Sequence, residues 1–587
     1  VDNGTMGNVP GKPSTWYMSW TRDAAPSVVM SSVANNMQFD TDGTLKIASG
    51  IEYGPWAFTA PQGMHVSSYE FDVKRAQDAG SATLSIDTPD GKTVEVTDEF
   101  QHVAVTGIGV DDANGFTVDA DPADANKCVN VKNFNVTVSR SIEISKNIMV
   151  FRYDGTTGYN VCYRIPAITT VENGPNKGRL IAINDYRYGG GDIGAGRIDL
   201  YQSHSDDNGL TWSEPGHLCD AEGNHVAEGN YTTDKDCAFG DAAIVSDRET
   251  GKVLMIAVGG HVNFFASRRD APNFCFRWYS EDGGDTWSDH QDITEQILSI
   301  FDGEAAYGKI DGQFFGSGRM TQSRQIKVGD YYRLYAVLSS QNDGGNTRNW
   351  ALYSDDFGQT WHILGGVPAV SSNGDEPKAE ELPDGSVLLA ARNRWGNRNF
   401  NVFRYTDVAK GEGSWLGTVA TDMGMGSINA CDGEIMILPV RNIETQEKCY
   451  MALQSFPYGG SRRNVSIAWK ALSQPEDFSS PSSFTTWDGR KQVSNLGSAY
   501  STMCWQHDNT LGFLFEEETF GKAYCGMFRN LTIEEITGDA YEYCADEDDS
   551  VRQGLTSAMI RYRLETEAPK GEPGKYVGQP TGEGNPE

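Results

Sequence analysis

The sequence lacks any long hydrophobic run. In 587 residues, no stretch approaches the roughly 18 consecutive apolar residues that a membrane-spanning helix needs. Helical periodicity is also missing over most of the chain, because apolar residues do not recur at intervals of three and four. We therefore expect neither insertion into a membrane nor a helical fold.

Positive charge is scarce. The chain has 48 Lys and Arg against 81 Asp and Glu, which gives a net charge of −33. The electrostatic field of this negative charge repels polyphosphates and anionic membranes, so nucleic acid is not an expected partner. Solubility explains the excess of acid, and an anionic ligand would need a local cluster of arginines.

Cysteine is sparse and has no metal-site pattern. The ten cysteines lack the paired spacing of a zinc site or of a disulfide scaffold. Local bridges Cys219–Cys237 or Cys504–Cys525 are one interpretation, and buried free thiols are at least as consistent with the pattern. No acidic loop has calcium-binding spacing, so we expect no metal and no cofactor.

The two ends of the chain suggest processing. Val1 opens the sequence in place of Met, and no signal peptide follows. Residues 564–587 are rich in Pro, Gly and Glu, which is typical of a flexible linker. We expect a protein that is secreted or attached to the cell surface.

The length predicts at least two domains, because a single core stops growing at about 250–300 residues. Residues 1–140 contain short stretches of alternating polar and apolar residues, which predict a β-sandwich. This domain could be a carbohydrate-binding module or a structural spacer. Four aromatic residues in it could stack on sugar or belong to a core: Trp16, Trp20, Trp56 and Tyr69.

Residues 141–563 contain many short strands separated by Gly and Asp turns, which indicates radial repetition. Within them the pattern Ser-x-Asp-x-Gly-x-Thr-Trp begins at Ser205, Ser280 and Ser354. In each copy the Ser and Asp side chains can hydrogen-bond the turn, Gly supplies a positive φ, and Trp packs under the hairpin. A structural role is therefore favoured over a catalytic one for Asp207, Asp282 and Asp356.

These repeats resemble the Asp boxes of sialidase β-propellers, although unrelated propellers also carry them. A second motif, YRIPAI at 163–168, resembles the Phe/Tyr-Arg-Ile-Pro motif with which the sialidase propeller begins. The chain thus resembles the bacterial exo-α-sialidases, or neuraminidases. The resemblance implies an all-β protein, with a six-bladed β-propeller over residues 141–563 after the β-sandwich.

Further segments extend the resemblance through the second region: INDYRYGGGDIGAG, DEPKAEELPDGSVLLAARNRW, GGSRRNVSIAW and AYSTMCWQHDNTLGFLFEE. The last of these ends its strand at an acidic residue, Glu516. The implied substrate-binding residues are Arg164, Arg187, Arg392 and Arg462, with Arg463 as the alternative to Arg462. The implied catalytic residues are Asp192, Glu376 and Tyr500.

The chemistry of sialic acid explains this set of residues. Its carboxylate is attached to the anomeric carbon, and three guanidiniums can bind it with bidentate, charge-assisted hydrogen bonds. A carboxylate nucleophile would be repelled there, whereas a neutral phenol is not. Glu376 would take the proton of Tyr500, and Asp192 would protonate the leaving oxygen and then activate water, which gives retention.

We therefore predict a glycoside hydrolase, a retaining exo-α-sialidase (EC 3.2.1.18) that forms a covalent tyrosyl-enzyme intermediate. Its substrates would be sialylated glycans and glycoproteins, such as mucin-type or milk sialosides, and the protein would be a monomer. The alternatives are a trans-sialidase, an anhydrosialidase, or a non-catalytic propeller that binds glycans.

Overall fold

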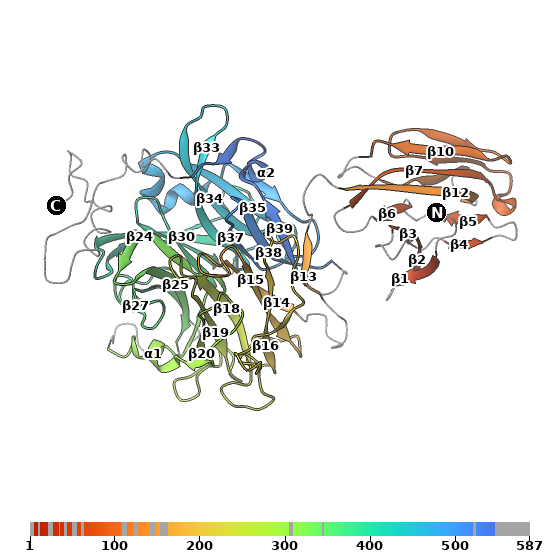
Figure 1. Cartoon of the computed structure of the whole chain (residues 1–587). Helices are drawn as coiled ribbons and strands as arrows, with labels where there is room; N and C mark the ends of the chain where they lie inside the picture. The colour runs from red at the N-terminus through yellow and green to blue at the C-terminus, as the bar shows by residue number, and fades with distance from the viewer. Residues whose placement is uncertain are drawn as a thin grey trace. The chain divides into compact units, whose positions relative to one another are not determined.

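The computed structural model divides the chain into two compact units, residues 1–146 and 147–587 (Figure 1). It describes residues 5–545 with gaps at 10–11, 21–27, 34–35, 40–43, 50–55, 60–63, 109–113, 123–126, 141–146, 153–162, 304–308, 343–345, 394 and 520–523. The predicted linker 564–587 lies outside the described residues. In the described part, both units are built almost entirely from β-strands, as predicted.

The first unit contains three antiparallel sheets in its described residues. They are, in hydrogen-bonded order, β1 (Thr5–Val9), β2 (Lys12–Trp20), β3 (Val28–Val33) and β6 (Ala57–Thr59); β10 (Gln101–Thr106), β7 (Met64–Arg75), β12 (Lys127–Arg140), β5 (Leu45–Ser49) and β4 (Asn36–Phe39); and β11 (Thr117–Asp121), β8 (Thr83–Asp87) and β9 (Thr93–Val96). A short 3-10 helix, η1 (Gln77–Ala79), follows β7.

Aromatic side chains fill the core of this unit. Trp56 and Tyr69 are buried, and the Tyr69 hydroxyl donates a hydrogen bond to the carbonyl of Gly115. Because neither ring reaches the surface, the interpretation of Trp56 and Tyr69 as sugar-stacking residues is wrong. The side chains of Trp16 and Trp20 lie outside the described part of the chain.

The second unit contains six sheets of four or five strands in its described residues. Three of them are β13 (Ile148–Phe151), β39 (Cys525–Leu531), β38 (Leu511–Glu517) and β37 (Ser501–Trp505); β14 (Tyr163–Thr170), β15 (Leu180–Arg187), β16 (Ile198–Ser205) and β17 (Gly216–His217); and β21 (Gln291–Asp292), β20 (Phe274–Ser280), β19 (Val253–Gly259), β18 (Phe239–Ser246) and β23 (Gly318–Arg319).

The other three follow along the chain. They are β22 (Gly312–Phe315), β25 (Tyr331–Gln341), β26 (Thr347–Ser354) and β27 (His362–Ile363), with β24 (Thr321–Val328) on β25; β28 (Pro377–Glu381), β29 (Val387–Asn393), β30 (Asn397–Asp407) and β31 (Glu412–Trp415), with β32 (Val419–Thr421) on β30; and β36 (Gly489–Gln492), β35 (Val465–Leu472), β34 (Lys448–Pro457), β33 (Ile435–Asn442) and β40 (Tyr541–Tyr543). The helices of this part are α1 (Thr294–Ser299), α2 (Ile533–Thr537), η2 (Pro475–Phe478) and η3 (Pro481–Thr485).

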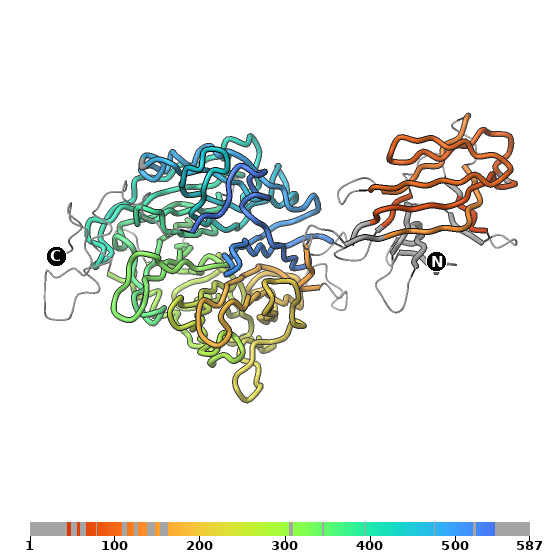
Figure 2. Tube along the Cα trace, turned by 45° about the horizontal axis from the view of Figure 1, so that its top comes forward, coloured from red at the N-terminus to blue at the C-terminus, as the bar shows by residue number. Residues whose placement is uncertain are grey.

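The first strand of the second unit pairs with a strand from its far end. Ile148 in β13 lies opposite Phe528 in β39, so residues from the beginning and the end of the unit share one sheet. Figures 1 and 2 show these orange and blue segments side by side. This pairing joins the first strand of the unit to the sheet that β37, β38 and β39 form. Strands such as β15 and β19 are buried along their whole length, because neighbouring sheets cover both faces.

The three Asp boxes lie where β16, β20 and β26 end. In the second copy, the Ser280 hydroxyl donates to Asp282 Oδ1 at 2.8 Å, and the Thr286 amide donates to the same oxygen at 2.9 Å. Gly284 has φ 92°, a conformation that favours glycine. The other two copies repeat these bonds. The predicted structural role of the aspartates as turn acceptors is confirmed.

The nine cysteines within the described residues are free thiols, Cys219, Cys237, Cys504 and Cys525 among them. The local bridges considered from the sequence are therefore absent, and the free-thiol interpretation holds for these four. Within the same residues, none of the helices has the length and apolar character needed to cross a bilayer.

Candidate active site

A tyrosine and a glutamate from segments that lead into two different sheets of the second unit meet in a hydrogen bond. Tyr500 immediately precedes β37, and Glu376 immediately precedes β28. The two residues are 124 positions apart, and the Tyr500 hydroxyl donates to Glu376 Oε1. The backbone amide of Tyr500 donates to Glu516 Oε2 at 3.0 Å, which fixes the start of β37. The phenol is therefore held beside a proton acceptor.

The surroundings of Tyr500 keep its phenol neutral. Burial raises the pKa of Tyr500 well above its ordinary value, the charge of Glu376 raises it further, and the charges of Arg392 and Arg164 lower it in part. A phenolate would not form here spontaneously. The proton can leave only as new bonding at the oxygen develops, and Glu376 is the group in position to accept it.

Three arginines surround this phenol. The guanidinium carbons of Arg164 and Arg462 lie 5.3 and 5.6 Å from the centroid of the Tyr500 ring. Arg392 donates from Nη1 to Glu376 Oε2 at 2.8 Å and to the Tyr500 hydroxyl at 3.1 Å. Segments that begin β14, end β29 and precede β35 therefore bring their guanidiniums to one place.

Arg462 differs from the other two arginines. Arg164 is paired with Glu516, Nε to Oε1 at 2.6 Å, and Arg392 is paired with Glu376. Among the described residues, the Arg462 guanidinium has no carboxylate within ion-pair distance. A guanidinium that faces a cavity without a carboxylate partner is well suited to bind an anion.

The neighbouring arginine, Arg463, takes another direction. Its Nη2 donates to the carbonyl of Asn495 at 3.3 Å, and its backbone forms a bridge with Gly497. Arg462, by contrast, lines the same cavity as Tyr500. Of the two alternatives left open by the sequence, the geometry therefore favours Arg462 as the third arginine of the cluster.

Arg187 holds a group of three carboxylates. It lies at the end of β15, buried, and donates from Nε and Nη2 to Asp185 Oδ2 at 3.0 and 2.7 Å. Its Nη2 also reaches Asp241 Oδ1 at 3.2 Å, and its Nη1 donates to Asp192 Oδ1. Arg187 therefore connects the wall of the cavity to the loop 188–197, which carries Asp192.

Asp192 is ionised in this arrangement. Partial burial raises its pKa, but the charge and hydrogen bond of Arg187 lower it more, and the charges of Arg164 and Arg462 add to the effect. The net pKa is below the ordinary range. The Asp192 side chain is still 87% exposed, on a loop whose Gly190, Gly194 and Gly196 have positive φ. The carboxylate can therefore reach both solvent and the cavity.

The cavity has a volume of about 780 Å³. Five of the seven residues predicted from the sequence line it: Asp192, Glu376, Arg392, Arg462 and Tyr500. Of the remaining two, Arg164 lies over the Tyr500 ring and Arg187 contacts Asp192. The structure thus brings all seven together. The arrangement can bind an anion, hold a nucleophile beside a base, and place a carboxyl group at the rim.

The sequence is similar to known proteins over much of its length. Residues 180–511, more than half of the chain, match the family described as "BNR repeat-like domain". The chain belongs to this family. A sialidase of Micromonospora viridifaciens is 29% identical over 370 residues, which are 61% of this chain and 50% of that protein. The chain therefore spans about half the length of this curated relative.

Solved structures support the fold of this BNR-repeat chain. A Hadza microbial sialidase, Hz136, has a TM-score of 0.51 and 18% identity, over 86% of this chain and 97% of that one. A leech intramolecular trans-sialidase has a TM-score of 0.50 and 14% identity, over 81% and 95%. The predicted resemblance to bacterial sialidases and the β-propeller architecture are confirmed.

Several residues at this cavity were not identified from the sequence. Asp375 also lines the cavity, and its position next to the predicted Glu376 was the sequence feature that could have identified it. Asp241 has φ 54°, and burial and the charge of Asp185 raise its pKa well above the ordinary range, although the charge of Arg187 opposes them. Three phenylalanines that line the cavity were also missed: Phe264, Phe265 and Phe314.

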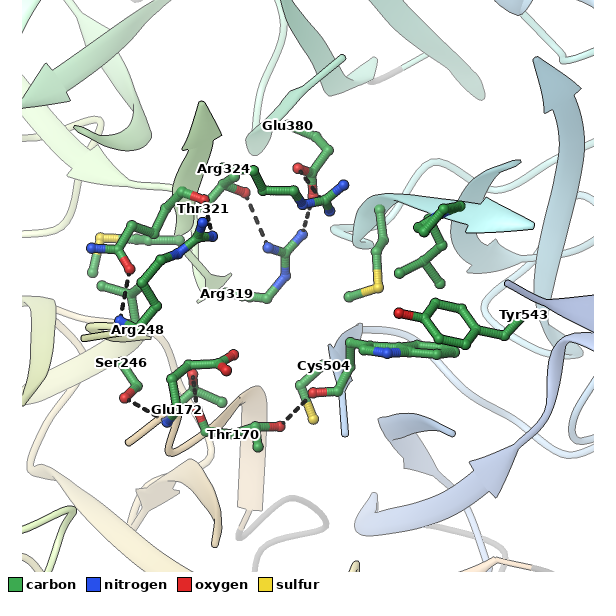
Figure 3. Close-up of a pocket in the computed structure, with 18 of the residues that line it drawn as sticks. Thr170, Glu172, Ser246, Arg248, Arg319, Thr321, Arg324, Glu380, Cys504 and Tyr543 are labelled. Carbon is green, nitrogen blue, oxygen red and sulfur yellow. Dashed lines mark hydrogen bonds and ion pairs between the residues drawn. The ribbon is translucent and has the colours of Figure 1, made fainter. Parts of the chain in front are cut away.

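A second cavity, of about 310 Å³, lies at the opposite ends of the same inner strands (Figure 3). β14 and β37 begin at the first cavity and end beside the second, which Thr170 and Trp505 line. Figure 3 shows Arg319 and Arg324 turned toward Glu380, and the Arg319–Glu380 pair measures 2.6 Å. None of the seven predicted site residues lines this cavity.

Proposed function

We propose that the chain is a retaining exo-α-sialidase, a glycoside hydrolase that removes terminal α-linked sialic acid from glycans and glycoproteins. The observation that carries the proposal is the hydrogen bond from Tyr500 to Glu376 beneath the three arginines. A module that only binds an acidic sugar needs the arginines alone. A phenol paired with a base beside them has a use in bond formation.

In the first step, Arg164, Arg392 and Arg462 bind the carboxylate of the sugar and thereby orient the anomeric carbon over the Tyr500 oxygen. The phenol oxygen forms a bond to that carbon, and its proton passes to Glu376. The glycosidic bond breaks, and the leaving oxygen takes a proton from Asp192. A neutral phenol suits this attack because the carboxylate attached to the reacting carbon would repel an anionic nucleophile.

In the second step, Asp192 acts as a base. It takes a proton from a water molecule, which attacks the anomeric carbon and releases Tyr500, while Glu376 returns the proton to the phenol oxygen. Two displacements at the same carbon give net retention of configuration. Each group thus ends the cycle in the protonation state in which it began.

The finer architecture belongs to the same proposal. We take the six sheets of the second unit as the six blades of one propeller, and the three sheets of the first unit as a β-sandwich. We further propose a secreted or surface-attached monomer that uses no cofactor in the reaction. Mucin-type or milk sialosides fit the substrate class.

The reaction is tested by digesting sialyllactose in heavy-oxygen water and analysing the product by mass spectrometry. Hydrolysis introduces one labelled oxygen at the anomeric carbon, because water supplies that oxygen in the second step. Transfer to another sugar, or intramolecular release of an anhydro product, introduces none. An unlabelled product would show that the protein catalyses one of these other reactions and not hydrolysis. The absence of any product would indicate a protein that only binds sialosides.

The pH dependence of kcat/KM should favour acid. Asp192 must be protonated to donate, yet Arg187 lowers its pKa, so only a small fraction carries the proton at neutral pH. That fraction grows roughly tenfold for each unit by which pH falls toward the pKa. For sialyllactose, we therefore expect kcat/KM to rise as pH falls toward the pKa of Asp192.

An aryl sialoside provides the control, because a phenolate leaves without a proton from Asp192. Its kcat/KM should depend less on pH over the alkaline side of the profile. In Asp192→Asn, turnover of sialyllactose should fall more than turnover of the aryl sialoside. Identical pH profiles for the two substrates would remove Asp192 from the role of acid.

A further inference from the structure

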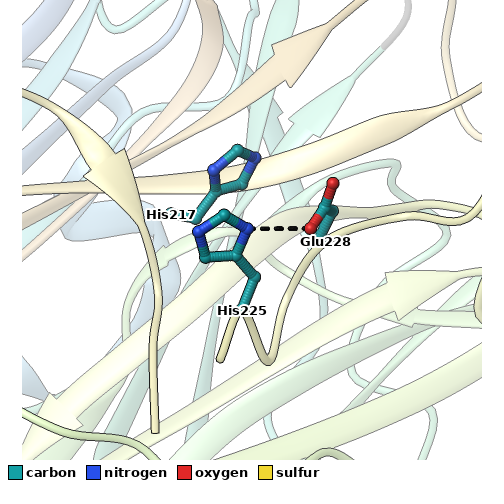
Figure 4. Close-up of side chains that lie close together, drawn as sticks. All are labelled: His217, His225 and Glu228. Atoms are coloured by element: carbon teal, nitrogen blue, oxygen red, sulfur yellow. Dashed lines mark hydrogen bonds and ion pairs between the residues drawn. The ribbon is translucent and has the colours of Figure 1, made fainter. Parts of the chain in front are cut away.

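Two histidines and a glutamate outside the cavity lie close together, one on the outer strand of a sheet and two in the segment that follows it (Figure 4). His217 belongs to β17, whereas His225 and Glu228 belong to the segment 218–238 that leads from β17 to β18. One ligand atom from each of the three lies within 4.8 Å of the others. The imidazole rings are stacked, with centroids 4.2 Å apart, and His225 Nδ1 lies 2.8 Å from Glu228 Oε2.

The backbone fixes this arrangement. The segment after β17 folds back on itself, so that Cys219 and His225 form an antiparallel bridge. The Val226 amide donates to the carbonyl of Leu218 at 2.8 Å, next to His217. Figure 4 shows the two rings one above the other, with Glu228 directed at His225. The cluster is therefore built by a hydrogen-bonded turn.

A buried carboxylate orients His217. The Nε2 of His217 lies 2.9 Å from Asp199 Oδ2, and Asp199 is buried. Asp199 also accepts hydrogen bonds from Nε and Nη2 of Arg197 at 2.9 and 2.8 Å. Such a carboxylate holds the proton on Nε2 and leaves the lone pair on the other ring nitrogen. Histidines that bind metal ions share this support from a carboxylate.

The local charge also favours a cation. Two carboxylates, Asp199 and Glu228, face one guanidinium, that of Arg197, so acidic groups outnumber basic ones beside the cluster. Arg197 contacts Glu228 through Oε1, and Oε2 is the oxygen on the side of His225. The His217, His225 and Glu228 side chains are 15%, 42% and 38% exposed, so an ion can enter from solvent.

We propose that His217, His225 and Glu228 bind one divalent transition-metal ion of the zinc class. Two imidazoles and one carboxylate suit zinc, cobalt or nickel, whereas calcium and magnesium prefer oxygen ligands alone. Water would complete the coordination. The site could not be predicted from the sequence, because a strand and a turn supply the ligands without the regular spacing of a known motif.

The site also adjoins the loop that carries Asp192. Asp199 accepts hydrogen bonds from the Tyr188 hydroxyl at 2.9 Å and from Arg197 Nε at 2.9 Å. Tyr188 and Arg197 are the two ends of the loop 188–197. An ion on His217 and Glu228 would therefore hold the base of this loop, a consequence that rests on the proposed function.

Zinc binding tests the site directly. Protein without a histidine tag is stripped with a chelator, dialysed and titrated with zinc chloride in a calorimeter. We expect one equivalent to bind, and to bind at least about tenfold more weakly in His217→Gln, His225→Gln and Glu228→Gln. The matched control is His204→Gln, on β16 of the same sheet and outside the cluster. Absence of stoichiometric binding, or unchanged affinity in the three variants, would overturn the proposal.

Cobalt substitution tests the ligand set. Imidazole and carboxylate ligands should give only weak visible bands. An intense band from thiolate to cobalt would instead indicate Cys219, whose Sγ lies 3.3 Å from the carbonyl oxygen of His217, and would overturn the assignment of Glu228.

Measurement of sialoside turnover distinguishes zinc binding itself from an effect of the bound ion on the loop 188–197. If zinc binds but sialoside turnover is equal in stripped and loaded protein, the loop does not depend on the ion. If no form of the protein turns over a sialoside, the proposed function fails, and the calorimetric result still decides the metal site.

Discussion

Replacement of Tyr500 by Phe should lower kcat for a sialoside by about a thousandfold or more, as loss of a nucleophile does in other hydrolases. The variant loses one oxygen, the phenol oxygen that the proposed mechanism uses as the nucleophile. The pair between Glu376 and Arg392 stays intact, because it does not involve the phenol. Steady-state kinetics with an aryl sialoside measure the effect, and thermal unfolding checks the fold.

Tyr524→Phe is the matched control. Tyr524 also lies against Arg164, with the guanidinium carbon 5.3 Å from its ring centroid, at the same distance as Tyr500. Its hydroxyl is not the one that meets Glu376. We expect kcat within a few-fold of the unchanged protein. Turnover by Tyr500→Phe close to that of Tyr524→Phe would exclude the tyrosyl intermediate.

Replacement of Arg462 by Ala should weaken the binding of a sialic-acid analogue by about 2 kcal/mol or more, which is at least roughly 30-fold in Kd. Arg462 has no carboxylate partner among the described residues, so the main partner that it loses is the ligand. The fold should change little. Calorimetric titration measures the affinity, and the same variant should also raise KM.

Arg463→Ala is the control for this prediction, because it removes the same charge one residue away. Its guanidinium bonds to the Asn495 carbonyl and does not line the cavity. Affinity for the analogue should stay within about twofold, the residual difference coming from the screened long-range field. A reversed order, with Arg463→Ala the weaker binder, would assign the third arginine to Arg463.

The features that the sequence predicts best are local. The turn of each Asp box closes through bonds between residues two to four positions apart, such as Ser205 to Asp207, so the motif itself predicts these bonds. Resemblance to a family added the long-range set, including the meeting of Tyr500 and Glu376 across 124 residues. Composition or periodicity alone would have placed neither residue.

Other features depend on conformation or packing that the letters do not show. The choice between Arg462 and Arg463 follows from the bridge of Arg463 to Gly497 and from the positive φ, 58°, of Asn464. Alternation in the first unit predicts strands but does not say which face is covered, and Trp56 and Tyr69 prove to be core. The histidine cluster needs a turn that brings His225 back onto β17.

The pairing of β13 with β39 has a practical consequence for dissecting the protein. A fragment that starts after Phe151 would lack the short strand that covers Gly526, Met527 and Phe528. The bare backbone of β39 would then be an open sheet edge, able to pair with the same edge of another molecule. An isolated fragment of the second unit should therefore begin within residues 141–146, upstream of Ile148, so that it keeps β13 to pair with β39.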